Sequence, residues 1–181
     1  MASGTDPGRL GSRRLARTRF LTLERDYLIE ASGRWAIREV VRHPGSVVII
    51  PWDGARVALI QQYRHATGRR ILELPAGKID VAGEPPEQTA RRECIEEIGL
   101  DPGTLTRVHG CFASPGFTDE YSHIYLAEDL VPVGSNPQGM EEEGSLIVWM
   151  TAAEASRALA GDGFEDSKTI VGIAALLARL P

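Results

Sequence analysis

Three carboxylates, Glu93, Glu96 and Glu97, stand within five consecutive positions of the chain. If this stretch is helical, Glu93 and Glu97 project from one face, with Glu96 one residue off it. Like charges at that spacing cost an isolated helix a few tenths of a kcal/mol, and a bound cation would reverse the sign of that cost. Hard divalent ions such as Mg²⁺ take oxygen ligands and use one or two carboxylates together with substrate phosphates. The cluster is therefore a candidate metal site.

The residues around the cluster predict a helix that would hold it. Pro85 and Pro86 suit a first helical turn, where a missing N–H costs nothing, and Gly99 suits a left-handed C-terminal stop. Four-residue spacing aligns the apolar residues of this stretch into one stripe. The stripe is made of Ala90, Cys94 and Ile98.

Taken alone, a cluster of this kind is more often a solvated helix face than a metal site. A longer pattern surrounds it, made of Gly77, Glu84, Arg92, Glu93, Glu96, Glu97, Gly99 and Leu100. This pattern resembles the Nudix box, a loop–helix–loop that binds Mg²⁺ at a pyrophosphate. It departs from the box by one extra residue between Gly77 and Glu84, in a loop where an insertion is cheap. The departure leaves the role of Glu84 open.

Length and composition indicate a globular protein with a substantial core, since the chain has 181 residues, of which 43% are hydrophobic and 25% charged. A net charge of −5 argues against a general nucleic-acid binder. No apolar run reaches the length needed to span a bilayer. The two cysteines, Cys94 and Cys111, show no metal-ligand spacing and fit a reduced, cytosolic protein.

Strands are expected on both sides of the helix, at Trp35–Val41, Ser46–Ile50, Arg56–Tyr63, Ile71–Leu74, Thr106–Phe112, Tyr121–Leu126 and Leu146–Met150. Asp53–Gly54 predicts a hairpin that would pair the strands before and after it. Asp101–Gly103 predicts a turn. A capping-box pattern at Thr151–Glu154 opens a second helix, and Ser167–Leu180 forms a closing one.

The resemblance to the family implies an α/β/α sandwich with a mixed β-sheet. In this chain, residues 18–45 would add an N-terminal β segment and residues 46–181 would form the Nudix domain. Residues 1–17 show no strand or helix periodicity and are expected to be disordered.

Outside the box, the chain is similar to the ADP-ribose pyrophosphatase branch of the family. The similar stretches are Gln62–Arg64, Leu72–Asp80, Ser114–Gly116 with Glu120, and the loop Asp80–Pro86, which is close to the loop of actinobacterial members. The resemblance implies a hydrolase that splits ADP-ribose into AMP and ribose 5-phosphate. It also implies Mg²⁺ as the cofactor, with Mn²⁺ as a substitute.

The resemblance assigns roles to residues of this chain. Its metal ligands would be the Ala76 carbonyl, Glu93, Glu96 and Glu97, and its substrate-binding residues would be Arg38, Glu39, Arg64 and Glu120. Arg64 suits a phosphate, because a guanidinium matches phosphate oxygens in a two-pronged way. Arg38 and Glu39 match residues that hold the adenosine half. Arg92 would orient a box glutamate, since it stands four residues before Glu96.

The family activates water with a carboxylate outside the box, and three acids lie in the polar connection before Leu146. Counting back without gaps from Trp149, the catalytic glutamate of similar enzymes falls on Glu142. A slip of one residue would give Glu143 or Glu141. A flexible connection is a suitable place for a residue that moves in after substrate binds.

Two other functions stay open at this point. The substrate could be another nucleoside diphosphate linked to a group X, such as a nucleotide sugar. The chain could also be a catalytically silent domain that binds ADP-ribose, although such a module would be expected to have lost box carboxylates. The branch further implies a homodimer through the N-terminal strands, and residues 20–41 carry apolar and aromatic side chains that one small domain would not fully bury.

Overall fold

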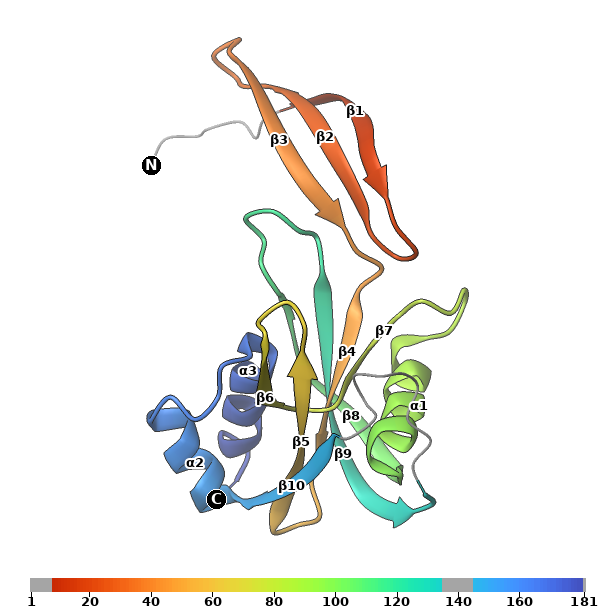
Figure 1. Ribbon diagram of the computed structural model, residues 1–181, viewed down its shortest axis with the longest axis vertical. Helices are drawn as coiled ribbons and strands as arrows, with labels where there is room; N and C mark the ends of the chain where they lie inside the picture. The colour runs from red at the N-terminus through yellow and green to blue at the C-terminus, as the bar shows by residue number, and fades with distance from the viewer. Residues whose placement is uncertain (1–7, 135–144, 181) are drawn as a thin grey trace. The chain divides into compact units, whose positions relative to one another are not determined.

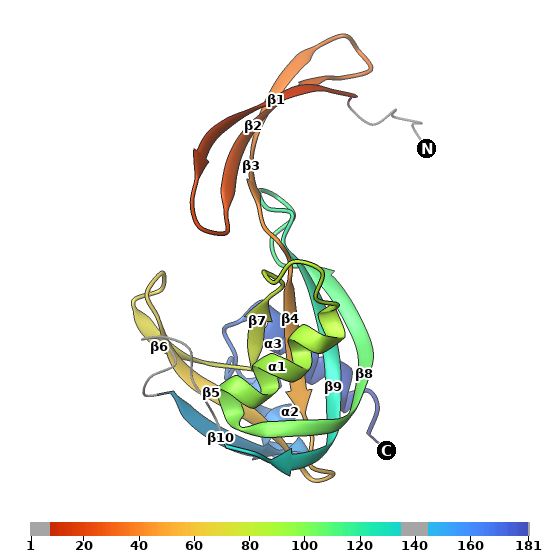
Figure 2. The same cartoon turned by 90° about the vertical axis from the view of Figure 1, so that its right-hand side faces the viewer.

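The computed structural model describes residues 8–134 and 145–180. Its elements are labelled in Figure 1 and seen from a second side in Figure 2. The chain divides into two compact units. One contains the residues up to Gly45 together with Phe112–Tyr121, and the other contains Ser46–Cys111 and the residues from Ser122 onward. Each unit is described by itself.

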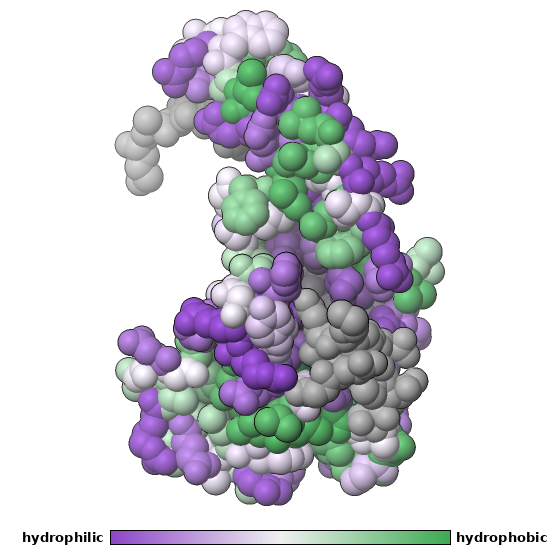
Figure 3. All heavy atoms as spheres, in the orientation of Figure 1, coloured by the Kyte–Doolittle hydropathy of each residue, from purple (hydrophilic) through white to green (hydrophobic). Residues whose placement is uncertain are grey.

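The N-terminal unit contains a three-stranded antiparallel sheet in the order β1-β2-β3. Its strands are β1 (Gly8–Arg17), β2 (Thr22–Ile29) and β3 (Trp35–Arg42). Several large apolar side chains of this sheet are exposed, among them Leu10, Trp35 and Ile37. Figure 3 shows hydrophobic side chains, in green, at the surface of these strands.

The expectation of disorder was wrong for Gly8–Arg17, which form β1. All ten residues of this strand are exposed, so its sequence needs no alternation of apolar and polar residues. Backbone pairing with β2 holds it instead, assisted by the Ser12 hydroxyl, which donates to the buried Asp26 carboxylate. Alternation of apolar and polar residues indicates a strand that is buried on one face only. This strand is exposed on both faces, and therefore the sequence analysis missed it.

The larger unit contains two sheets, in the orders β7-β4-β9-β8 and β10-β5-β6. Their strands are β4 (Ser46–Pro51), β5 (Arg56–Arg64), β6 (Arg69–Glu73), β7 (Ala76–Lys78), β8 (Leu100–Phe112), β9 (Tyr121–Pro132) and β10 (Leu146–Thr151). β4 pairs in parallel with β9 and antiparallel with β7, so the sheet is mixed. The helices are α1 (Pro86–Ile98), α2 (Ala152–Ala160) and α3 (Ser167–Leu177).

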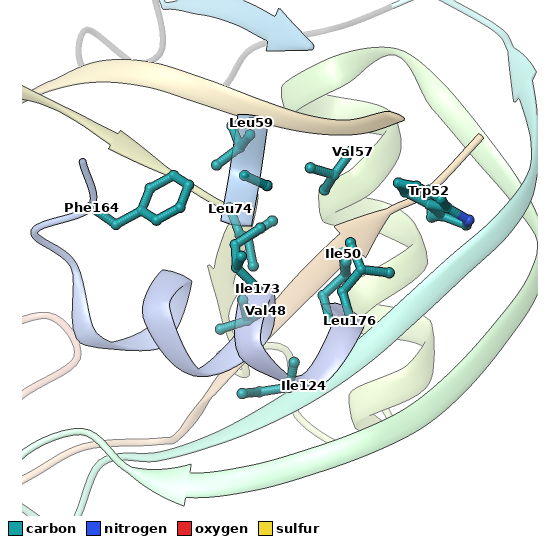
Figure 4. Close-up of a cluster of buried hydrophobic side chains, with 11 residues drawn as sticks. Val48, Ile50, Trp52, Val57, Leu59, Leu74, Ile124, Phe164, Ile173 and Leu176 are labelled. Carbon is teal, nitrogen blue, oxygen red and sulfur yellow. The ribbon is translucent and has the colours of Figure 1, made fainter. Parts of the chain in front are cut away.

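The strand β4 is buried along its whole length, and the side chains on its two faces pack in two different hydrophobic clusters. Val48 and Ile50 pack in a cluster that includes residues of α2 and α3 (Figure 4). Val47 and Ile49 pack in a second cluster with the apolar stripe of α1, which is Ala90, Cys94 and Ile98. Helices therefore cover both faces of the strands, and the predicted α/β/α sandwich is confirmed.

The helix α1 begins and ends where the sequence predicts. Pro85 is its extended N-cap, and Gly99 ends it in the left-handed conformation at φ 69°. The capping box of α2 is also confirmed, because Thr151 and Glu154 exchange their side-chain and backbone hydrogen bonds. No helix in the part of the chain that the structure describes is long and apolar enough to cross a membrane.

One local prediction was right only in part, and another was wrong. The tight turn at Asp53–Gly54 forms, because the Asp53 N–H donates to the Arg56 carbonyl at 3.0 Å and Trp52 bridges Val57. The strands before and after it, β4 and β5, join different sheets, so the expected hairpin does not extend into a paired ladder. The expected turn at Asp101–Gly103 is part of β8, which begins at Leu100. Gly103 serves close packing there, since a Cβ on it would lie 2.8 Å from Cβ of Asp129. At Asp101–Gly103, pairing and packing within the sheet override the local turn signal.

Candidate active site

The helix α1 presents two of its carboxylates in a nearly buried position. Glu93 is 9% exposed and Glu97 is 8% exposed, while Glu96 is partly buried. They are desolvated because α1 packs against β4 through the apolar stripe that adjoins them. A buried carboxylate without a partner is costly, so the partners of these groups decide what the site can do.

The segment that leads into β7 brings backbone atoms to Glu97. The Ala76 N–H donates to Oε2 of Glu97 at 2.9 Å. One residue earlier, the Pro75 carbonyl accepts from Ile49 N–H at 2.8 Å, which ties the segment to β4. The structure thus places Ala76, a predicted metal ligand, beside a second predicted ligand.

Glu93 lies directly against the backbone of Gly77. A Cβ built on Gly77 would lie 1.9 Å from Cδ of Glu93, so a side chain at this position would force the Glu93 carboxylate to move. This contact gives a physical reason for glycine in the box, because only glycine allows the backbone to approach so closely. Gly77 therefore makes room for the carboxylate of Glu93.

Arg92 is the cation that joins the remaining carboxylates. Its Nη1 donates to Glu93 Oε1 at 2.7 Å and to Glu96 Oε2 at 3.1 Å. The predicted pairing of Arg92 with Glu96 is confirmed. The guanidinium is only partly exposed, and hydrogen bonding to Glu84 is the main cause that raises its pKa, followed by Glu93.

Glu84, whose role the sequence left open, belongs to the same network. Both of its oxygens accept from Arg92, at 3.3 Å from Nε and 3.1 Å from Nη2. The Thr89 hydroxyl donates to Glu84 at 2.9 Å. The hydrogen bonds from Arg92 hold the pKa of Glu84 below its usual value. The extra residue in the preceding loop thus leaves Glu84 in contact with the helix.

The residues fit a hard divalent cation, although their carboxylates do not converge on one point. Within residues 8–134 and 145–180, no group of three or more His, Cys, Asp or Glu side chains has a metal-binding arrangement. Different groups hold the two carboxylates, since Arg92 donates to Glu93 and the Ala76 N–H donates to Glu97. The donor set is nevertheless oxygen-rich and nearly buried, and the space that Gly77 leaves is filled only by a carboxylate.

Arg64, the predicted phosphate ligand, lies at the end of β5 and is bound by Glu73 of β6. Its Nε donates to Glu73 Oε2 at 2.7 Å, and the Glu73 side chain is only 5% exposed. The sequence analysis missed Glu73 as a partner. Its signal was a single acid within the apolar run Ile71–Leu74, which is unusual for a buried strand unless the acid is paired.

The other predicted substrate residues belong to the N-terminal unit. A groove of about 460 Å³ there is lined by residues of β3, including Arg38 and Glu39, and by Pro115–Asp119. Glu39 accepts from Arg25 at 2.5 and 3.1 Å, a partner that the sequence analysis did not identify. Glu120 follows the groove-lining loop, and its N–H donates to the Thr118 hydroxyl. The volume is in the range of small-molecule pockets.

The three acids proposed to contain the catalytic base, Glu141, Glu142 and Glu143, lie outside the described residues. The chain re-enters the described part just before β10, whose first residue, Leu146, pairs with Gln61 of β5. Gln61 stands three positions before Arg64.

Comparisons with known proteins agree with this geometry. Residues 42–171 match the family model of the NUDIX domain. An ADP-ribose pyrophosphatase of Mycobacterium tuberculosis is 41% identical, over 85% of this chain and 75% of that protein. An ADP-ribose pyrophosphatase of Bacillus subtilis is 35% identical, over 78% and 77%. A crystal structure of an ADP compounds hydrolase matches with a TM-score of 0.84 and 25% identity, covering 97% of this chain and 95% of that one.

The contact between Gly77 and Glu93 makes a prediction about metal affinity. Gly77→Ala should displace the Glu93 carboxylate and weaken Mn²⁺ binding by roughly 10–100-fold, as titration of Mn²⁺ into the purified protein would measure. Gly103→Ala is the matched control, because its Cβ would crowd Asp129 elsewhere in the same unit. This control should lose stability and keep its Mn²⁺ affinity. Unchanged Mn²⁺ binding in Gly77→Ala would contradict the assignment of Glu93.

Proposed function

The chain belongs to the Nudix family of pyrophosphohydrolases, and we propose that it hydrolyses ADP-ribose to AMP and ribose 5-phosphate with Mg²⁺ as its cofactor. The observation that carries this proposal is the intact cluster of Glu93, Glu96 and Glu97, set against Ala76 and Gly77. Two relatives that cover most of the chain are ADP-ribose pyrophosphatases, which supports the choice of substrate.

We assign the metal to the Ala76 carbonyl, Glu93, Glu96 and Glu97, and Mn²⁺ is expected to substitute for Mg²⁺. When bound, such a cation would neutralise charge developing on the pyrophosphate and lower the pKa of a bound water. The protein supplies the placement of the ligands. Arg92 holds Glu93 and Glu96, and the Ala76 N–H holds Glu97. Arg92 is therefore a positioning residue.

Arg64 is assigned to a phosphate of the substrate. Its pairing with the nearly buried Glu73 supports this role, because one hydrogen bond at Nε orients the planar guanidinium. Arg38 and Glu39 are assigned to the adenosine half, and Glu120 is assigned to substrate binding. The groove beside Arg38 and Glu39 supports that assignment by its size.

The water that attacks phosphorus needs a base other than the metal ligands, since a metal-bound carboxylate is a poor base. We assign this role to Glu142, with Glu143 as the neighbouring alternative. Neither Cys94 nor Cys111 forms a disulfide, which supports a reducing, cytosolic setting for the enzyme.

A substrate panel tests the proposed reaction against its nearest alternative, hydrolysis of a nucleotide sugar. With Mg²⁺ present, kcat/KM for ADP-ribose should exceed that for nucleotide sugars by at least about tenfold, with AMP and ribose 5-phosphate as products. A higher kcat/KM for a nucleotide sugar would contradict the proposal and identify the nucleotide sugar as the preferred substrate. Tight binding of ADP-ribose without turnover would instead identify a silent binding domain.

The metal assignment predicts the behaviour of Glu97→Gln. Turnover should be lost, while stability in EDTA stays equal or rises by a few tenths of a kcal/mol, because repulsion between Glu93 and residue 97 is relieved. The glutamine oxygen can still accept from Ala76, so β7 should keep its place. Glu87→Gln is the control, since Glu87 lies in the first turn of α1 and is exposed. Wild-type turnover in Glu97→Gln would contradict the assignment of the metal to Glu93, Glu96 and Glu97.

The base assignment predicts that Glu142→Gln lowers kcat by roughly 10²–10⁴-fold while substrate and metal binding change little. Glu141→Gln and Glu143→Gln serve as controls in the same assay. If Glu142→Gln keeps its activity and one of the controls loses it, the base is that neighbour. Activity in all three single variants would place the base elsewhere in the chain.

We also propose a homodimer formed through the N-terminal sheet. The exposed apolar side chains of that sheet, Leu10, Trp35 and Ile37, support this, because such patches usually mark an interface. Light scattering at micromolar concentration should give the mass of two chains, and Trp35→Glu should shift it toward one. A fully active monomer of the wild type would rule out the dimer.

A further inference from the structure

The segment Leu74–Ala76 is held at three consecutive residues by three different elements. The Leu74 N–H donates to the Thr169 hydroxyl of α3 at 2.9 Å. The Pro75 carbonyl accepts from Ile49 of β4, and the Ala76 N–H donates to Glu97 of α1. The second and third contacts belong to the sheet and to the carboxylate cluster. The first contact comes from α3, which carries none of the proposed metal ligands.

The Thr169 hydroxyl is fully buried and fixed on both sides. It donates its proton to Asp166 Oδ2 at 2.8 Å, and its oxygen therefore faces the Leu74 N–H as an acceptor. Asp166 also accepts from the Thr169 N–H and from Lys168 Nζ. Burial acts to raise the pKa of Asp166, but Lys168 and the hydrogen bonds outweigh it and lower that pKa, so the carboxylate stays ionised.

The same helix touches the segment a second time, one turn further along. A Cβ on Gly172 would lie 2.4 Å from Cδ1 of Leu74, so the Leu74 side chain packs directly on the helix backbone. Leu74 is 1% exposed and lies in the core beside Ile173 (Figure 4). Because both the backbone and the side chain of Leu74 are held by α3, the segment cannot shift without moving against this helix.

We propose that Thr169 is a positioning residue of the metal site, and that its hydroxyl sets the place of Ala76 through Leu74. This inference rests on the proposed function, in which the Ala76 carbonyl is a metal ligand. A buried N–H that loses its acceptor is unfavourable, so the segment would shift to find another partner. That shift would move the Ala76 carbonyl, together with the Glu97 carboxylate that the Ala76 N–H holds. Groups that orient metal ligands in this way typically change metal affinity by 10–100-fold.

The test compares Thr169→Val, which removes the hydroxyl at nearly constant volume, with Thr169→Ser, which keeps it. The measurement is the dissociation constant of Mn²⁺, obtained from the spin-resonance signal of free Mn²⁺ without substrate. The constant should rise about tenfold in Thr169→Val and stay close to the wild-type value in Thr169→Ser.

Thr151→Val is the control for lost stability, because it removes a helix-capping hydroxyl of α2 whose partner is Glu154. Both valine variants should unfold at lower temperature than the wild type in EDTA, but only Thr169→Val should bind Mn²⁺ more weakly. If Thr169→Val does not fold, Asp166→Asn replaces it, since this change removes the charged acceptor of the Thr169 proton. The Mn²⁺ constant should then rise as well, by a smaller factor.

The outcomes separate this inference from the proposed function. Wild-type Mn²⁺ affinity in a folded Thr169→Val or Asp166→Asn would overturn the inference, and so would a loss in Thr169→Ser as large as in Thr169→Val. Neither result would contradict the assignment of the metal ligands, provided that Glu97→Gln weakens Mn²⁺ binding. If Glu97→Gln binds Mn²⁺ as tightly as the wild type, the metal site itself is wrong and the inference falls with it.

Discussion

The site depends on the hydrogen bonds that hold a cluster of carboxylates on and beside α1. Glu84, Glu93 and Glu96 each accept from Arg92, while Glu97 accepts from the Ala76 N–H. These carboxylates are mostly buried, so solvent screens the repulsion between them only in part. Placing them there is costly, so the rest of the unit must hold the helix firmly. A divalent cation bound among these carboxylates would reduce the repulsion between them.

The packing beneath α1 supplies that support. The stripe of Ala90, Cys94 and Ile98 lies on Val47 and Ile49, and the opposite face of β4 lies on residues from α3. Burial raises the pKa of the Cys94 thiol to about 12, so Cys94 acts as a packing residue and not as a nucleophile. Through Leu74 and Thr169 the C-terminal helix also reaches the segment beside the carboxylates. The hydrophobic clusters on both faces of β4 therefore support the segments that carry the proposed metal ligands.

Local signals predicted the parts of this arrangement that are continuous in sequence. The two prolines, the apolar stripe and Gly99 defined α1, and the β-branched run Val47–Ile50 defined a strand buried on both faces. Contacts between distant segments were not predictable, because side chains that meet across the fold leave no spacing to read. The bond from Leu74 to Thr169, which are 95 residues apart, is of this kind. The strand β1 and the start of β8 were missed for a related reason, since pairing and close packing with other strands decide them.

Anomalous diffraction from crystals soaked in Mn²⁺ tests the central claim most directly, because it locates the cation without relying on turnover. The account predicts a peak within bonding distance of the Glu93 and Glu97 carboxylates and of the Ala76 carbonyl oxygen. In the same crystals Arg92 should still contact Glu84. A peak elsewhere on the protein, with Glu93 and Glu97 keeping their contacts to Arg92 and Ala76, would contradict the account.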